Sequence, residues 1–100
     1  MQTKQDIMDL LKTHLPEFNK KFGVKTLGIF GSFARDEAVD GSDLDVLVEF
    51  ERPIGLRFME FSDELEKIVS LPVDVLTPAG INSIRQSEIS QNIKNSIVYV

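Results

Sequence analysis

Two aspartates, Asp43 and Asp45, stand in an apolar run that ends at Phe50. Side chains alternate across a strand, so both carboxylates are expected on one face, with Leu44 and Val46 on the other. Two carboxylates about 4 Å apart repel each other by roughly 4 kcal/mol at an effective dielectric constant near 20. Mg²⁺ removes this penalty, because it binds one or two carboxylates together with substrate phosphates. The pair therefore predicts a magnesium site.

A third acid, Asp74, lies between Val73 and Val75 in a later apolar run. A charge in the middle of a strand is unfavourable unless it is paired or bound to a metal. If this strand neighbours the strand of Asp43 and Asp45, all three acids can converge. Two metals about 3.5–4 Å apart could then clamp an in-line phosphoryl displacement. These three aspartates are the candidate catalytic residues and the candidate ligands of two Mg²⁺ ions.

A small-residue turn, Gly31-Ser32, lies where an apolar strand is expected to give way to a helix. Backbone N–H groups at such a junction favour an anion. Gly31 would let a phosphate approach the main chain, and Ser32 would add a hydroxyl donor. Arg35, three positions after Ser32, could hold the same phosphates by paired hydrogen bonds. Gly31, Ser32 and Arg35 are therefore the candidate nucleotide-binding residues.

Each of these signals has an ordinary structural alternative. Gly31-Ser32 alone is a turn signal, and Asp43 with Asp45 alone is typical of an exposed strand face or turn. Asp74 alone could be a satisfied buried acid, and Arg35 a surface residue. The combination of Gly31-Ser32, about ten intervening residues, the Asp43 and Asp45 strand, and then the Asp74 strand favours the functional interpretation.

Helices and short strands alternate around these residues. Helices are expected at 2–14, 16–22, 33–38, 56–69 and 81–92, and strands at 25–30, 42–49 and 73–77. Pro16 separates the first two helical pieces, and Ser32 is expected to cap the third helix. The β-prone segment Ile97–Val100 could be a strand, a helix tail or a contact patch. The order predicts an α/β (α+β) fold, with a small mixed β-sheet flanked by helices.

Composition limits the class of partner and the compartment. The 100 residues are expected to form one domain, 1–100. The net charge of −5 argues against direct binding of nucleic acid, which usually requires a basic face. The chain has no cysteine, so it has no disulfide framework. It shows neither a signal peptide nor the roughly 18–20 apolar residues that span a bilayer. We therefore expect a cytoplasmic protein without membrane contact.

The chain resembles the nucleotidyltransferase superfamily, which includes DNA polymerase beta and the aminoglycoside nucleotidyltransferases. The family pattern is hydrophobic-Gly-Ser, a spacer, Asp-hydrophobic-Asp-hydrophobic, and a third acid on a later strand. It is matched by Phe30-Gly31-Ser32, Asp43-Leu44-Asp45-Val46 and Val73-Asp74-Val75. With Ala34-Arg35 and Glu37-Ala38 in the spacer, the chain is most similar to the minimal nucleotidyltransferases (MNT proteins). The position after Arg35 is often glycine there and is Asp36 here, which is not expected to affect the chemistry.

This resemblance implies a nucleotidyltransferase fold and an NTP substrate, usually ATP, bound with magnesium. An acceptor hydroxyl would attack the α-phosphorus, and pyrophosphate would leave. Gly31 and Ser32 would hold the triphosphate, Asp43 and Asp45 the metals, and Asp74 a metal or the nucleophile's proton.

The resemblance also implies a partner protein. Minimal members are similar to the antitoxin half of HEPN/MNT toxin–antitoxin pairs. There the enzyme resembles a protein adenylyltransferase that modifies a tyrosine of its HEPN ribonuclease partner. A HEPN-type toxin is therefore the expected partner and acceptor.

Two other functions remain open at this point. Larger family members append a helical domain that binds the acceptor, and this chain is expected to take its acceptor surface from a second chain. A homodimer could instead transfer NMP to the hydroxyl of an antibiotic or metabolite. A third possibility is a binding-only antitoxin that occludes its toxin, against which the intact set of Gly31, Ser32, Asp43, Asp45 and Asp74 weighs.

Overall fold

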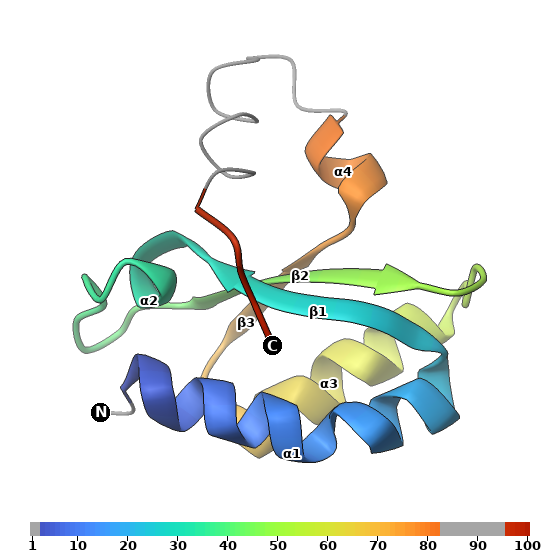
Figure 1. The fold of residues 1–100 in the computed structure, drawn as a ribbon, viewed down its shortest axis with the longest axis horizontal. Coiled ribbons are helices and arrows are strands. Elements are labelled where there is room, and N and C mark those ends of the chain that lie inside the picture. The colour runs from blue at the N-terminus through green and yellow to red at the C-terminus, as the bar shows by residue number, and fades with distance from the viewer. Residues whose placement is uncertain (1–2, 83–95) are drawn as a thin grey trace.

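The computed structural model describes residues 3–82 and 96–100. Helices and strands alternate along the chain as the sequence predicts (Figure 1). The elements are α1 (Lys4–Phe22), β1 (Val24–Phe30), α2 (Gly31–Ala34), β2 (Leu44–Phe50), α3 (Arg57–Val69), β3 (Val73–Leu76), α4 (Pro78–Asn82) and β4 (Val98–Tyr99).

Helix α1 begins with a capping box, in which Thr3 and Asp6 each bond the backbone N–H of the other. It ends where Gly23 adopts φ +72° and donates its N–H to the carbonyl of Asn19. The prediction of two pieces separated at Pro16 is wrong, because one helix continues through the proline. Phe18 and Phe22, both fully buried beyond Pro16, extend the apolar stripe that begins earlier in the helix. Burying two aromatic side chains contributes about 3–6 kcal/mol, enough to offset the roughly 3 kcal/mol cost of an interior proline.

Within residues 3–82 and 96–100, four strands form one mixed sheet in the order β3-β2-β1-β4. β1 pairs antiparallel with β2 and β4, whereas β2 and β3 run parallel. The prediction of a small mixed sheet is confirmed, but the sheet has one strand more than the three predicted. That strand lies within the tail Ile97–Val100, where Tyr99 pairs with Gly28 and Val98 with Ile29.

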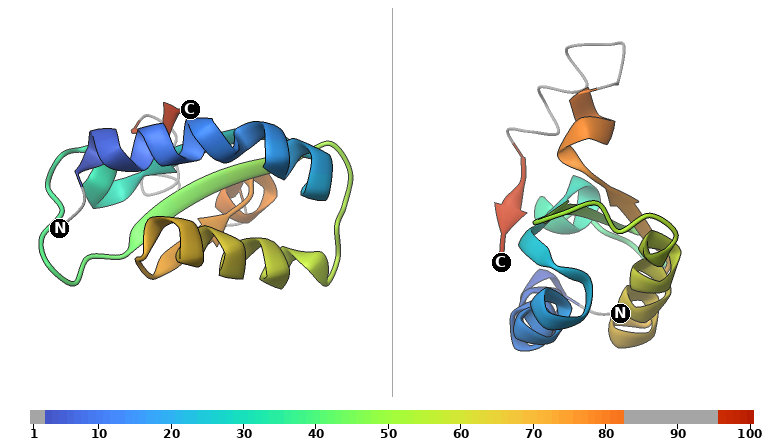
Figure 2. Two further views of the ribbon diagram at one scale, coloured as in Figure 1. Left: turned by 90° about the horizontal axis from the view of Figure 1, so that it is seen from below. Right: turned by 90° about the vertical axis from the view of Figure 1, so that its right-hand side faces the viewer.

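Helices α1 and α3 lie side by side on one face of the sheet (Figure 2), while α4 lies on the other side (Figure 1). The core between the helices and the sheet centres on Phe61 of α3. The rings of Phe18, Phe22 and Phe50 contact it edge-on, with centroids 5.3, 5.3 and 5.4 Å away. The helix predicted at residues 56–69 therefore packs into the core through its buried apolar residues Phe61, Leu65 and Val69.

Two predicted helices differ from the structure in extent. The helix expected at 33–38 is the four-residue α2, which begins at Gly31 and ends at Ala34. The helix expected at 81–92 lies mostly outside the described residues, whose last helix before the gap, α4, begins at Pro78. Within residues 3–82 and 96–100, no helix is long and apolar enough to cross a membrane.

Candidate active site

Asp45 and Asp74 are direct partners in the parallel register of β2 and β3. Register partners project from the same face of a sheet, and neighbouring strands lie about 4.7–4.9 Å apart. The strands of these two acids are therefore neighbours, which is the arrangement that a three-acid site requires. The acids face away from α1 and α3, because the alternate residues of β2 (Leu44, Val46 and Val48) are buried in the core beneath the helices.

Asp43 stands immediately before β2, in the loop from α2. The loop closes on a turn in which Ser42 Oγ accepts the N–H of Val39 and Ser42 N–H donates to the Val39 carbonyl, both at 2.9 Å. One residue after Asp43, the N–H of Leu44 donates to the carbonyl of Pro72 at 2.9 Å. These bonds fix the chain on both sides of Asp43 and join the start of β2 to the start of β3.

Burial differs among the three acids. Asp45 is partly buried, whereas Asp43 and Asp74 are exposed. The expected cost of a charge within the strand of Asp74 is therefore small, because β3 is the edge strand and its acid face is open to solvent. The unfavourable electrostatic energy of the cluster therefore falls mainly on Asp45, because it is the acid that is partly buried.

Gly31 packs directly against the carboxylate of Asp45. Phe30 is the register partner of Asp45 in the antiparallel pair of β1 and β2, so Gly31 emerges beside it. A Cβ added at Gly31 would overlap Oδ2 of Asp45 and would lie 3.1 Å from Cγ. Gly31 also has φ +72°, a conformation that L side chains rarely adopt. Glycine at this position is therefore explained by the carboxylate beside it as well as by the backbone.

Ser32 lies inside α2 and does not cap it. The residue at the N-cap position is Phe30, and no side chain bonds the helix start. The prediction that Ser32 caps a helix over 33–38 is therefore wrong, since the chain turns helical at Gly31, one residue before Ser32. The serine side chain, which is partly buried, stands in the first turn beside Gly31.

The end of α2 is a Schellman motif. Glu37 N–H donates to the Ser32 carbonyl at 2.8 Å, and Asp36 N–H donates to the Phe33 carbonyl at 3.2 Å. Asp36 takes the left-handed conformation that the motif requires, with φ +57°. Glycine would adopt this φ without strain, so the motif does not require aspartate at this position.

Arg35, the residue after α2, forms an ion pair with Glu37, its Nε donating to Oε2 at 3.0 Å. In the part of the chain that the structure describes, no lysine or arginine forms an ion pair with Asp43, Asp45 or Asp74. Among residues 3–82 and 96–100, the three acids are therefore not held in ion pairs.

The electrostatic environment of Asp45 disfavours its charged form. Burial, then the charge of Asp74, then that of Asp43 raise the pKa of the Asp45 carboxyl above its usual value. The nearby Arg35 guanidinium lowers this pKa and so offsets part of the effect. The acids are therefore close enough to repel one another.

The residues present fit a divalent cation that binds together with a nucleotide. Among residues 3–82 and 96–100, no three His, Cys, Asp or Glu side chains are gathered closely enough to hold a metal by themselves. Mg²⁺ does not require such a cage, since it is usually bound by one or two carboxylates and substrate phosphates. Asp45, with Asp43 and Asp74 beside it, supplies that oxygen donor set.

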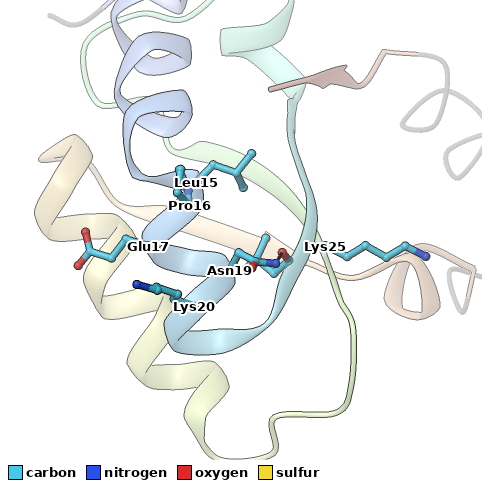
Figure 3. Close-up of a pocket in the computed structure, with 7 residues that line it drawn as sticks. Leu15, Pro16, Glu17, Asn19, Lys20 and Lys25 are labelled. Atoms are coloured by element: carbon cyan, nitrogen blue, oxygen red, sulfur yellow. Dashed lines mark hydrogen bonds between the residues drawn. The ribbon is translucent and has the colours of Figure 1, made fainter.

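Two of the cavities that the described residues form lie away from the acids. One, of about 730 Å³, lies between α1 and the start of β1. Its lining includes Leu15, Pro16 and Lys20 on α1, and Lys25, which extends from β1 away from the helix (Figure 3). The second, of about 540 Å³, lies beyond the ends of β2 and β3, beside Phe50 and Pro78. Neither of these two cavities is lined by a predicted site residue.

Glu37 lies near the site, and the sequence alone does not predict a role for it. Glu37 is the ion-pair partner of Arg35, the cation that acts on Asp45. Its position two residues after Arg35 does not by itself predict an ion pair. The pair forms because the Schellman motif reverses the chain at Asp36.

The sequence matches the nucleotidyltransferase domain family over residues 11–100. It is 37% identical over 101 aligned positions to the protein adenylyltransferase MntA of Thermococcus cleftensis, covering 100% of this chain and 98% of the relative. It is also 37% identical over 101 positions to MJ0128 of Methanocaldococcus jannaschii, with 100% of both chains covered.

Solved structures share the fold. A minimal nucleotidyltransferase superposes with a TM-score of 0.75 at 23% identity, covering 97% of this chain and 95% of that one. A toxin–antitoxin structure with AMP-PNP superposes with a TM-score of 0.62 at 17% identity, covering 98% and 72%. The chain therefore belongs to the nucleotidyltransferase domain family and has the minimal nucleotidyltransferase fold, and its relatives include enzymes named protein adenylyltransferases.

Proposed function

We propose that this chain is a Mg²⁺-dependent protein adenylyltransferase and an antitoxin, which transfers AMP from ATP to a tyrosine of a HEPN-type toxin. The observation that carries the proposal is the parallel register of Asp45 with Asp74, beside a glycine that admits the Asp45 carboxylate. The identity to MntA over the full chain, and the fold shared with a toxin–antitoxin structure, support a protein acceptor.

Asp43, Asp45 and Asp74 would hold two Mg²⁺ ions. When bound, these ions supply charge neutralisation for the transferring phosphoryl group. Backbone N–H groups at Gly31 and Ser32, the Ser32 hydroxyl and the Arg35 guanidinium would hold the triphosphate. With the reactants so placed, catalysis consists mostly of positioning and electrostatic stabilisation.

The transfer itself forms one bond and breaks another. The acceptor oxygen bonds to the α-phosphorus as the bond from that phosphorus to the bridging α–β oxygen breaks, and pyrophosphate leaves. The hydroxyl proton passes to a carboxylate, for which exposed Asp74 is the candidate. The product is an acceptor carrying AMP in a phosphodiester linkage.

Labelled nucleotide tests this function. The protein is incubated with α-³²P-labelled ATP, Mg²⁺ and the protein encoded by the neighbouring gene. We expect label on a tyrosine of that protein, and none with the variant carrying Asp43→Ala and Asp45→Ala. Label on aminoglycosides alone would instead indicate a small-molecule enzyme. Absence of label, with partner binding that survives both substitutions, would indicate a binding-only antitoxin.

A further inference from the structure

Arg35 is the cation that acts on Asp45, yet its ion-pair partner lies elsewhere. The Arg35 N–H donates to the Gly31 carbonyl at 3.2 Å, and Gly31 contacts the Asp45 carboxylate, so Arg35 lies beside Asp45. The charge of the Arg35 guanidinium lowers the pKa of the Asp45 carboxyl. Its Nε, however, donates to Glu37 Oε2 at 3.0 Å. Within the described residues, no ion pair joins Arg35 to any of the three acids. The arginine thus lies beside the acidic cluster without binding to it.

The backbone explains why Glu37 can reach Arg35. The Schellman motif reverses the chain at Asp36, whose φ is +57°. It also bonds Glu37 N–H to the Ser32 carbonyl at 2.8 Å, which fixes the backbone of Glu37 against the first turn of α2. The two side chains therefore meet although only one residue separates them in sequence.

Without Glu37, the nearby carboxylates would be the natural partners of the guanidinium. Arginine binds carboxylates through paired N–H donors, and a carboxylate engaged in this way offers fewer oxygens to a cation. An Arg35 paired with Asp45 or Asp43 would therefore compete with Mg²⁺ for the same oxygens. It would also turn its donors away from an incoming phosphate.

We propose that Glu37 is a positioning residue, which binds the Nε of Arg35 and keeps the guanidinium off the carboxylates of Asp43 and Asp45. The carboxylates are then free for a divalent cation, and the terminal N–H groups of Arg35 are free for an anionic substrate. This inference rests on the proposed function for the identity of that anion. Its effect on the cation can be measured without nucleotide or acceptor.

A double-mutant cycle with Mn²⁺ as the probe tests the inference. Wild type, Glu37→Gln, Arg35→Met and the double variant are titrated with Mn²⁺, and free Mn²⁺ is followed by electron paramagnetic resonance. We expect Glu37→Gln to weaken Mn²⁺ binding about threefold when Arg35 is present, an effect of the size that exposed charge pairs produce. In the Arg35→Met background, Glu37→Gln should alter Mn²⁺ binding much less, because there is no guanidinium that could move from residue 37 to the carboxylates.

Asp40→Asn is the matched control, since it removes one exposed negative charge from the same loop. It should weaken Mn²⁺ binding equally in both Arg35 backgrounds. Equal effects of Glu37→Gln in both backgrounds would mean that Glu37 acts only through its own charge, and would overturn the inference. So would a wild-type protein that binds no Mn²⁺. A coupled cycle in a protein that transfers no label would instead contradict the proposed function alone.

Discussion

Gly31 and Asp45 are in direct contact, and a side chain at residue 31 would occupy the space of Asp45 Oδ2. This contact connects the two halves of the candidate site, since Gly31 opens α2 and Asp45 lies in β2. From sequence, the glycine was expected to admit a phosphate. The structure gives it a further role, because it admits the carboxylate that is proposed to hold the metal.

Gly31→Ala should therefore do more than strain the backbone. Gly23 is a matched control, because it has the same φ of +72° and no atom within 4 Å of an added Cβ. A left-handed conformation costs an alanine about 1–2 kcal/mol, and Gly23→Ala should lose about that much unfolding free energy. Gly31→Ala should lose more and should also abolish AMP transfer, because Asp45 must move. Urea unfolding measures the two losses. Equal losses of unfolding free energy in Gly31→Ala and Gly23→Ala, with AMP transfer retained in Gly31→Ala, would contradict this role.

The raised pKa of Asp45 predicts how stability depends on pH. A carboxyl with a folded-state pKa above its unfolded value destabilises the fold as pH rises through the folded pKa, and this loss is absent below the unfolded value. Asp45→Asn should therefore stabilise the metal-free protein at pH 7. Because the group is partly exposed, the gain should be about 0.5 kcal/mol after allowance for screening.

Urea unfolding in EDTA from pH 3 to pH 7 measures this difference between Asp45→Asn and wild type. The difference should shrink as the pH falls. Asp63→Asn, a change at an exposed acid on α3, is measured alongside as the control for losing one negative charge away from the acidic cluster. A loss of stability at pH 7 on replacing Asp45 would refute the repulsion argument.

Divalent cations should stabilise the wild-type protein through the same acids. At ten times its dissociation constant, a ligand that binds only the folded state adds about 1.4 kcal/mol to the unfolding free energy. Mg²⁺ should therefore raise the melting temperature of wild type, and EDTA should reverse the change. The variant with Asp43→Ala and Asp45→Ala should show no rise, which differential scanning calorimetry can measure. A rise of equal size in both proteins would place the cation elsewhere.

Asp36 should tolerate glycine better than alanine. Its φ of +57° is part of the Schellman motif that ends α2. Asp36→Ala should lose about 1 kcal/mol, because aspartate tolerates the left-handed region better than alanine does. Asp36→Gly should be neutral or slightly stabilising, since the relief of strain is offset by the entropy of the unfolded glycine. Thermal melts of both variants measure the difference, and a glycine variant less stable than the alanine variant would exclude this explanation.

Sequence alone determined the parts of this protein that depend on neighbouring residues. The alternation of Leu44, Asp45 and Val46 assigns Asp45 to one side of a strand and the apolar residues to the core. Asp43, which was also predicted in this strand, lies just before it. Local patterns also predict helix ends at residues 22 and 69, where α1 and α3 end. These patterns are local, because each is set by backbone geometry within a few residues.

Only the tertiary structure decided which strands are neighbours and at what register. The pairing of Asp45 with Asp74 joins residues 29 positions apart in sequence, and a one-residue slip would have put Asp74 on the opposite face. Helix α1 continues through Pro16 because Phe18 and Phe22 pack on distant α3, and β4 forms because β1 offers it an edge. The contact of Gly31 with Asp45 likewise needs the pairing of β1 with β2. Local sequence specifies which groups can do the chemistry, and burial and strand pairing across the chain bring them together.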